Sequence, residues 1–413
     1  MRVRIHRGAH EIGGNCIEVA NVGDRIVLDL GRPLAASWDE EVPLPDVDGL
    51  SGGDDHLLGV VLSHPHLDHY GLARGLGEGV PIYMGADAAR VLDAAAFFSP
   101  ISASPPLSGA LRDREAFRLG PFTITPFVVD HSAFDAYSLL IEAGGRRLFY
   151  SGDFRGHGRK RALFERLIDR PPTVDAVLME GTNIRYGKPS EDQSSERDVE
   201  DDLVETFRST DGLVATFSSA QNIDRLVTVF RAARRSGRIL VMDLYTATIA
   251  AATGRTTIPQ PGFDGVAVYV PFRQRVRVKQ SSEFERVAEI KHLRVYPEDL
   301  ASGRGKYAYL GVSSAAQELV ASGALEGGAI VWSLWSGYLK QTSGARMMRL
   351  LEDAKVPLVM HHTSGHASLA DLQRLAKAFD PARIVPIHSE ATDRFGEHFD
   401  HVEQHADGEW WEV

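Results

Sequence analysis

The sequence contains a single cysteine, Cys16, which excludes an intrachain disulfide bond. It has no apolar run long enough to cross a membrane, and its first residues alternate in polarity instead of forming the apolar core of a signal peptide. Positive charge is outweighed by negative charge: a net charge of −11 argues against a protein that binds polyanions over its whole surface. We therefore expect a cytoplasmic protein without a membrane anchor, in which bound metal ions or a local basic strip would attract any nucleic acid.

The 413 residues are enough for two to three domains, and the order of the expected elements indicates α/β structure. In the first half, apolar segments typical of strands are each followed by a His, Asp or Glu. Strand ends that meet at one edge of a sheet assemble a site in this way. Residues 197–242 instead alternate helix and strand, which predicts a parallel sheet covered by helices. Because strands followed by ligands return after Val356, the simplest arrangement is a metal-site domain interrupted by an inserted α/β domain.

The densest group of potential metal ligands follows the apolar segment Leu57–Ser63, which we expect to be a buried strand. It comprises His64, His66, Asp68 and His69. The first two are two residues apart and point the same way in an extended chain, and the last two lie at the turn into a helix expected over Tyr70–Leu76. One segment can thus offer ligands to two neighbouring ions. The alternative interpretation is a polar loop with unrelated histidines.

This His-x-His-x-Asp-His pattern after a buried strand resembles the signature of the metallo-β-lactamase superfamily. A two-metal site needs about six or seven ligands, and further candidates follow expected strands. We expect Asp153 to bridge two divalent ions, one held by His64, His66 and His131 and the other by Asp68, His69 and His388. Imidazole and carboxylate ligands favour Zn²⁺, with Mn²⁺ as the alternative. Taken alone, His131 also fits a core or capping histidine, and Asp153 also fits a turn residue.

The remainder of the chain resembles the β-CASP nuclease branch of this superfamily and, within it, the RNase J group. The resemblance is carried by Glu180 in Met-Glu-Gly-Thr, His366 in Ser-Gly-His-Ala, His388 in Pro-Ile-His-Ser-Glu, and the segments Gly8–Asn15 and Thr363–Ser368. It implies an α/β fold in which a metallo-β-lactamase αββα sandwich is interrupted by an inserted β-CASP domain of Rossmann-like type. The expected boundaries are 1–185 and 356–413 for the two parts of the sandwich and 186–355 for the insert.

The resemblance also implies hydrolysis of RNA phosphodiester bonds in RNA processing or decay. The expected mode is a 5′-to-3′ exonuclease, with endonuclease activity as a second mode. Catalytic roles are implied for Asp68, Glu180 and His366, with His366 as the general acid oriented by Glu180. Ser364, Gly365 and Ser368 resemble the pocket that holds a 5′-monophosphate. The alternative for the two serines is local turn and cap bonding.

Two other functional classes fit the same residues. A DNA nuclease of the same family would turn over substrates that lack the 2′-hydroxyl, although the presence of His388 favours RNA within the resemblance. A non-catalytic RNA-binding subunit would purify without metal. The expected partner is therefore RNA, with no membrane. RNase J proteins carry a further C-terminal domain that supports dimerisation, and the sequence ends 25 residues after His388, so whether it forms a homodimer stays open.

Overall fold

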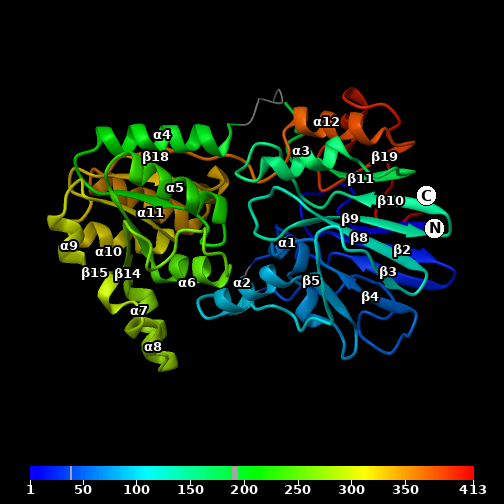
Figure 1. The fold of residues 1–413 in the computed structure, drawn as a ribbon, viewed down its shortest axis with the longest axis horizontal. Helices are drawn as coiled ribbons and strands as arrows, with labels where there is room; N and C mark the ends of the chain where they lie inside the picture. Colours follow the sequence, from blue (N-terminus) through cyan, green and yellow to red (C-terminus); the bar gives the residue numbers. More distant parts are fainter. Residues whose placement is uncertain (38–39, 188–193) are drawn as a thin grey trace. The chain divides into compact units, whose positions relative to one another are not determined.

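A computed structural model describes residues 1–37, 40–187 and 194–413 of the chain. Residues 188–193, which fall in the polar connection expected at the start of the insert, lie outside the described residues. By their internal contacts the residues form two compact units (Figure 1). The first comprises Met1–Asp93, Ile101–Gln193 and Gly365–Val413, and the second comprises Ala94–Pro100 and Ser194–Ser364.

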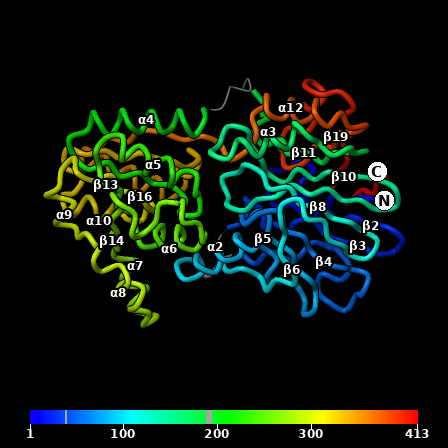
Figure 2. Tube along the Cα trace, in the orientation of Figure 1, coloured from blue at the N-terminus to red at the C-terminus, as the bar shows by residue number. Residues whose placement is uncertain are grey.

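The first unit contains two mixed sheets. Sheet 1 has the order β20-β1-β2-β3-β4-β5-β6, with bounds β1 Arg2–Arg7, β2 Cys16–Asn21, β3 Asp24–Leu28, β4 Leu57–Val61, β5 Ile82–Gly85, β6 Gly109–Leu111 and β20 Trp410–Glu412. Sheet 2 has the order β19-β11-β10-β9-β8-β7, with bounds β7 Phe117–Leu119, β8 Phe122–Val128, β9 Tyr137–Ala143, β10 Arg146–Tyr150, β11 Ala176–Glu180 and β19 Arg383–Ile387. The C-terminal strand β20 pairs with β1, and Figure 2 shows the two ends of the chain side by side.

This unit has four layers, and an apolar cluster lies between each pair of neighbouring layers. The central cluster lies between the sheets and joins Ile5 and Leu28 of sheet 1 to Leu139 and Leu178 of sheet 2. The outer face of sheet 1 packs against α1 (Leu67–Tyr70), the 3₁₀ helix η1 (Ala73–Gly75) and α2 (Ala86–Ala96). The outer face of sheet 2 packs against α3 (Arg161–Asp169), α12 (Leu369–Phe379) and the 3₁₀ helix η6 (Thr392–Glu397). This is the predicted αββα sandwich, and sheets buried on both faces explain the apolar runs Leu139–Ile141 of β9, Leu148–Tyr150 of β10 and Ala176–Met179 of β11.

The second unit is built on sheet 3, in which every neighbouring pair of strands is parallel. Its order is β15-β14-β13-β16-β12-β17-β18, with bounds β12 Val214–Phe217, β13 Ile239–Asp243, β14 Val266–Tyr269, β15 Arg294–Val295, β16 Tyr307–Gly311, β17 Ala329–Trp332 and β18 Leu358–Met360. The α-helices of this unit are α4 Glu196–Ser209, α5 Ile223–Arg235, α6 Leu244–Ala252, α7 Phe272–Ser281, α8 Glu285–Ala288, α9 Pro297–Ser302, α10 Ala316–Ala321 and α11 Thr342–Asp353. The parallel sheet predicted for the insert is therefore present.

Two local features differ from the expectations. The helix expected over Tyr70–Leu76 begins earlier, at Leu67, and ends at Tyr70, because the Leu72 N–H donates to the Leu30 carbonyl and not to the Asp68 carbonyl. Asp68 and His69 therefore lie on helix α1 and not on the turn before it. Strand β18 pairs with β17 and belongs to the second unit, which ends at Ser364. The sequence instead predicted that the inserted domain ends at residue 355. Within the described ranges, no helix combines the length and apolarity that a bilayer span requires.

Candidate metal centre

The side chains of the centre follow five strands of the first unit. His64 and His66 follow β4, and α1 then carries Asp68 and His69. The other members come from sheet 2: His131 follows β8, Asp153 follows β10, Glu180 ends β11 and His388 follows β19. The prediction of a single sheet edge was therefore wrong. The side chains come from the strand ends of both sheets of the sandwich, which brings together residues more than 300 positions apart.

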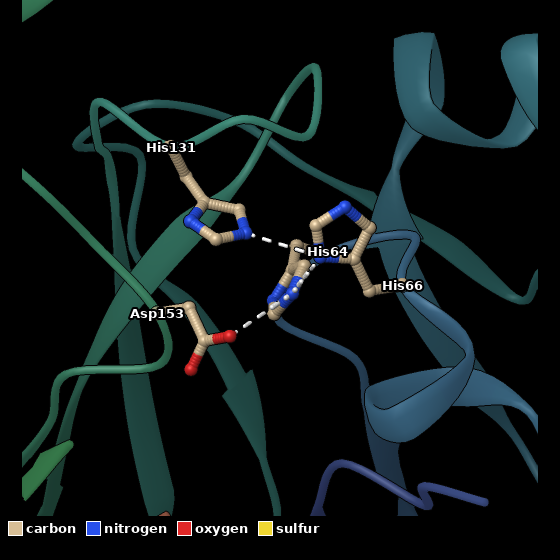
Figure 3. A group of neighbouring side chains, drawn as sticks. All are labelled: His64, His66, His131 and Asp153. Carbon is tan, nitrogen blue, oxygen red and sulfur yellow. Dashed lines mark hydrogen bonds and ion pairs between the residues drawn. The ribbon is translucent and has the colours of Figure 1, made fainter. Parts of the chain in front are cut away.

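Four of these side chains converge at the first position (Figure 3). His64, His66, His131 and Asp153 each point one potential ligand atom toward the others, and these atoms all lie within 4.8 Å of one another. Nε2 of His64 lies 3.2 Å from Nδ1 of His66, and Nε2 of His131 lies 3.1 Å from the same Nδ1 atom. Oδ2 of Asp153 lies 3.6 Å from Nε2 of His64.

A second group lies beside the first and comprises Asp68, His69 and His388. Nε2 of His388 lies 3.2 Å from Nε2 of His69 and 3.4 Å from Oδ2 of Asp68. Asp153 also faces this group, with its Oδ2 atom 3.2 Å from Nε2 of His69. The structure therefore brings together all seven residues predicted as metal ligands, with Asp153 between the two groups.

The separations between the donor atoms are those expected of ligands around two bound cations. Ligands of a tetrahedral Zn²⁺ ion at about 2.0–2.1 Å lie roughly 3.3 Å apart, close to the nitrogen–nitrogen separations of both groups. Asp153 is 1% exposed, and neither of its carboxylate oxygens accepts a hydrogen bond from any residue that the structure describes. A buried carboxylate without hydrogen bonds is costly, whereas a bound cation would satisfy it. The residues present thus fit a two-metal site.

Hydrogen bonds at the far side of three imidazole rings orient them. The Nδ1 atom of His131 donates to the Gly365 carbonyl oxygen at 2.6 Å, and the Nδ1 atom of His69 donates to Oδ2 of Asp29 at 2.7 Å. The Nδ1 atom of His64 lies 3.0 Å from the Ser63 hydroxyl, which itself donates to Asp29. In its neutral form each ring therefore carries its proton on Nδ1 and turns the lone pair of Nε2 toward the centre, as a metal ligand requires.

Burial and charge act on the protonation of these groups. Burial lowers the pKa of His64 and of His131 well below the usual value for histidine, and lowers the pKa of His66 to about 4. His69 differs, because the nearby charges of Asp153 and Asp29 outweigh burial and raise its pKa. The same carboxylates that attract a proton to His69 attract a metal cation. Burial would raise the pKa of Asp153, but the surrounding imidazoles, first His388 and then His69, hold it well below its usual range.

Asp29, which directly follows strand β3, has no role among the predictions from the sequence. The structure buries it completely, and its carboxylate accepts hydrogen bonds from His69, from the backbone and hydroxyl of Ser63, and from the Tyr150 hydroxyl. It thereby orients two of the candidate ligands. The sequence pattern that predicted the ligands also applies to Asp29, because it is a carboxylate directly after an apolar strand.

We expect Asp29→Asn to weaken metal binding by about 10- to 100-fold, because an amide cannot accept all of these hydrogen bonds and the His69 ring loses its orientation. Competition with a metal chelator measures this affinity. Tyr150→Phe is the matched control, since it removes one hydrogen bond to the same carboxylate and leaves the bond to His69. Equal metal affinity in Asp29→Asn and wild type would exclude an orienting role for Asp29.

Glu180 and His366 lie beside the two groups. Glu180 is buried, and its two carboxylate oxygens accept hydrogen bonds from the backbone N–H groups of Thr182 and Ala367, both at 3.0 Å. The Nδ1 atom of His366 lies 3.7 Å from Oε2 of Glu180 and 3.5 Å from Oδ2 of Asp153. Burial would lower the pKa of His366, but the charges of Asp153 and Glu180 outweigh it and raise the pKa to about 9.

Thr182 is a further residue that sequence reasoning missed. Its hydroxyl oxygen lies 3.1 Å from Nδ1 of His366 and 2.9 Å from Nδ1 of His388. It therefore links the ring predicted as the general acid to a ring predicted as a ligand. The side chain of His366 stays 20% exposed, in contrast to the fully buried ring of His388, so that a substrate can reach it.

The residues predicted as a 5′-phosphate pocket have local structural roles. Ser368 is the N-cap of α12, and its hydroxyl oxygen accepts a hydrogen bond from the Asp371 backbone N–H. The Gly365 carbonyl accepts the His131 bond, and a Cβ atom at Gly365 would lie 2.5 Å from the Ser132 hydroxyl. Ser364 is the last residue of the second unit. Capping, which was the alternative for Ser368, is therefore present, and phosphate binding stays a prediction.

A buried ion pair supports the segments that carry His131 and Asp153. Arg155 and Asp130 are both fully buried, and Nε of Arg155 lies 3.3 Å from Oδ1 of Asp130. The backbone N–H of Arg155 also donates to the Asp130 carbonyl at 2.7 Å. Arg155 thus joins the segments after β8 and β10 to each other.

We expect Arg155→Leu to lower the free energy of unfolding by about 3–5 kcal/mol, because it removes one charge of a buried ion pair and keeps the other, the carboxylate of Asp130, in the interior. Urea unfolding of both proteins gives this difference. Arg166→Leu is the control: its pair with Asp113 is exposed, and its loss should cost less than about 1 kcal/mol. A difference below 1 kcal/mol for Arg155→Leu would show that the pair does not hold these segments.

Comparison with known proteins agrees with this geometry. Residues 36–212 match the beta-lactamase superfamily domain, and residues 358–406 match the Zn-dependent metallo-hydrolase RNA specificity domain. The chain is 22% identical to Ribonuclease J of Sinorhizobium meliloti over 367 residues, which cover 85% of this chain and 61% of the relative. It is 28% identical to Ribonuclease J of Mycobacterium tuberculosis (strain H37Rv) over 248 residues, 58% of this chain and 43% of the relative. The chain thus spans about half the length of these relatives.

Two further similarities concern other kinds of protein. The transcription termination factor FttA of Methanothermobacter thermautotrophicus is 26% identical over 262 residues, which cover 58% of this chain and 39% of that protein. The crystal structure of a protein of unknown function from Enterococcus faecalis V583 has the same fold, with a TM-score of 0.79, 21% identity and 99% of both chains covered. With its αββα sandwich and parallel-sheet unit, the chain belongs to the metallo-β-lactamase superfamily, carries an RNA specificity domain of the Zn-dependent metallo-hydrolases, and is a distant homologue of RNase J and FttA in the β-CASP family.

Proposed function

We propose that this protein is a ribonuclease that hydrolyses RNA phosphodiester bonds with two divalent metal ions, most favourably Zn²⁺. The observation that carries the proposal is the pair of adjacent ligand groups, with Asp153 in the first and 3.2 Å from His69 of the second, and the partly exposed ring of His366 beside them. The match to an RNA specificity domain over residues 358–406, which include His366 and His388, supports RNA as the substrate class.

Each group of residues has a part in this chemistry. Two ions bound at the centre would lower the pKa of an attacking water and offset negative charge on the phosphoryl oxygens. Asp153 would contact both ions. His64, His66 and His131 would complete the ligands of one ion, and Asp68, His69 and His388 those of the other. His366 would deliver a proton to the leaving oxygen, oriented by Thr182 through its Nδ1 atom and by the nearby carboxylate of Glu180.

The test is a cleavage assay on one RNA sequence that carries a 5′-monophosphate, a 5′-triphosphate or a 5′-hydroxyl, with its DNA counterpart alongside. We expect the wild type to contain close to two metal ions per chain and to release mononucleotides from the 5′-monophosphate RNA. The Asp68→Ala, His69→Ala double variant should be inactive. Internal cuts irrespective of the 5′ end would keep the metal chemistry and remove the 5′-phosphate pocket of Ser364, Gly365 and Ser368.

Two outcomes would contradict the proposal. Equal or faster turnover of the DNA counterpart would make the protein a DNA nuclease of the same fold. No cleavage of RNA or DNA, with Zn²⁺ and with Mn²⁺ supplied, together with purification free of metal, would make it a non-catalytic RNA-binding protein.

A further inference from the structure

The second unit exposes two large aromatic side chains next to each other. Trp335 is 54% exposed and Tyr338 is 42% exposed, and both belong to the segment that forms the 3₁₀ helix η5 (Ser336–Lys340) after β17. Their ring centroids are 5.5 Å apart and the ring planes are nearly perpendicular, at 86°. Single exposed apolar residues are ordinary, but an adjoining aromatic pair indicates a binding surface.

The Trp335 ring is held in place by its surroundings. A Cβ atom at Gly337 would lie 2.2 Å from this ring, so the indole packs directly on the glycine backbone. The Trp335 carbonyl accepts hydrogen bonds from Nε1 of Trp332 at 3.3 Å and from the backbone N–H of Tyr338 at 3.2 Å. A ring fixed in this way loses little conformational freedom when a planar ligand stacks on it.

The charge around this pair is the reverse of that of the whole protein. In a chain of net charge −11, residues 327–351 contain no Asp or Glu and carry Lys340, Arg346 and Arg349. All three are exposed, and none forms an ion pair with a residue that the structure describes. Other arginines of the same unit do have acidic partners, such as Arg275 with Glu318. Helix α11 carries the two arginines and packs against η5, which carries Tyr338. The two acidic residues of α11, Glu352 and Asp353, lie at its C-terminal end.

We propose that Trp335, Tyr338, Lys340, Arg346 and Arg349 form a platform that binds single-stranded RNA. Bases would stack on the aromatic rings, and the basic side chains would contact the phosphates. A purely apolar partner would leave the three positive charges without negative partners, whereas RNA supplies bases for the aromatic rings and phosphates for the basic side chains. This inference rests on the proposed function, because it assigns the platform to the same class of substrate.

The test compares two oligomers of equal length and equal phosphate count. One is a fluorescently labelled twelve-residue oligouridylate with phosphorothioate linkages, which slow hydrolysis during the titration. The other is the same backbone without bases. We expect the wild type to bind the base-containing oligomer more tightly than the abasic one. Trp335→Ala should weaken the first by roughly 5- to 100-fold, the effect of losing one stacked base, and should not change the second.

Three variants separate stacking from charge and from damage to the fold. Trp335→Phe should retain much of the preference for bases. Lys340→Ala should weaken both oligomers equally and make binding less dependent on salt. Tyr296→Ala is the matched control, because Tyr296 is 49% exposed in the same unit and also has a basic neighbour, Arg294, over its ring; it should bind as wild type does.

The outcome also separates this inference from the proposed function. Unchanged binding by Trp335→Ala overturns the platform, even if the protein cleaves RNA. Base-dependent binding that Trp335→Ala abolishes upholds the platform, even if no cleavage is found and the proposed function fails. A change of oligomeric state in Trp335→Ala, measured by light scattering, with unchanged RNA affinity would make the surface a contact between protein chains and would overturn the proposal.

Discussion

Replacing Asp153 with asparagine is expected to remove RNA cleavage and to lower the bound metal below two ions per chain. Asp153 faces both ligand groups, and neither of its oxygens has a hydrogen-bond donor among the described residues. The amide of asparagine has nearly the same volume but carries no charge to offset the repulsion between two cations. The loss of activity should exceed the roughly 100-fold that follows when a residue merely supports a ligand.

Metal analysis and thermal unfolding measure this effect independently of activity. Wild-type protein should unfold at a lower temperature after chelation, because bound metal stabilises only the folded state. Asp153→Asn should show a much smaller response to the chelator. Asp169→Asn is the control, since Asp169 is 77% exposed on the first unit and belongs to neither ligand group. A fully active Asp153→Asn with two bound ions would contradict the two-metal site.

Replacing His366 with alanine is expected to lower kcat by about 100- to 10,000-fold while the metal content stays at the wild-type value. The ring is partly exposed, and its Nδ1 atom is held by Thr182, which leaves Nε2 as the nitrogen that can deliver a proton. The geometry also allows another role, because His366, His388 and Asp153 form a third group with ligand atoms within 4.8 Å of one another.

A change of leaving group distinguishes the two roles of His366. A nucleotide p-nitrophenyl ester has a leaving group that departs without a proton, so the defect of His366→Ala should be much smaller on this ester than on RNA. If His366 instead binds metal, the variant should lose metal and show the same defect on both substrates. That second result would replace the general acid with an additional ligand.

Much of the local structure could be predicted from the sequence. Helix α5, Ile223–Arg235, lies in the segment predicted to alternate helix and strand, its apolar residues recur with helical spacing, and Gly237 follows its end. Helix α12 begins at Leu369 with Ser368 as the predicted N-cap. Strand β19, Arg383–Ile387, is one of the strands followed by a ligand that the sequence predicted after Val356. These features depend on neighbours within a few positions, which a sequence displays directly.

Features that depend on distant residues could not be predicted in the same way. His388 adopts a left-handed backbone conformation, with φ of 51°, and its N–H donates to the Gly8 carbonyl, about 380 positions away. Nothing beside His388 in the sequence indicates this turn. Helix α1 ends early because its next backbone groups bond to distant segments: the Leu72 N–H donates to the Leu30 carbonyl, and the Asp68 carbonyl accepts from the Asn15 N–H.

The sequence by itself determined which residue types the centre contains, because histidines and carboxylates directly after apolar strands are visible as a local pattern. Only the tertiary structure decided how they act together. It set the strand ends of two sheets beside each other, placed Asp153 between the groups, and supplied Asp29, Thr182 and the Gly365 carbonyl to orient the rings. The physical reason is that each of these partners reaches its ring by a hydrogen bond across long sequence separations, and such bonds form only once the sandwich has buried both ends.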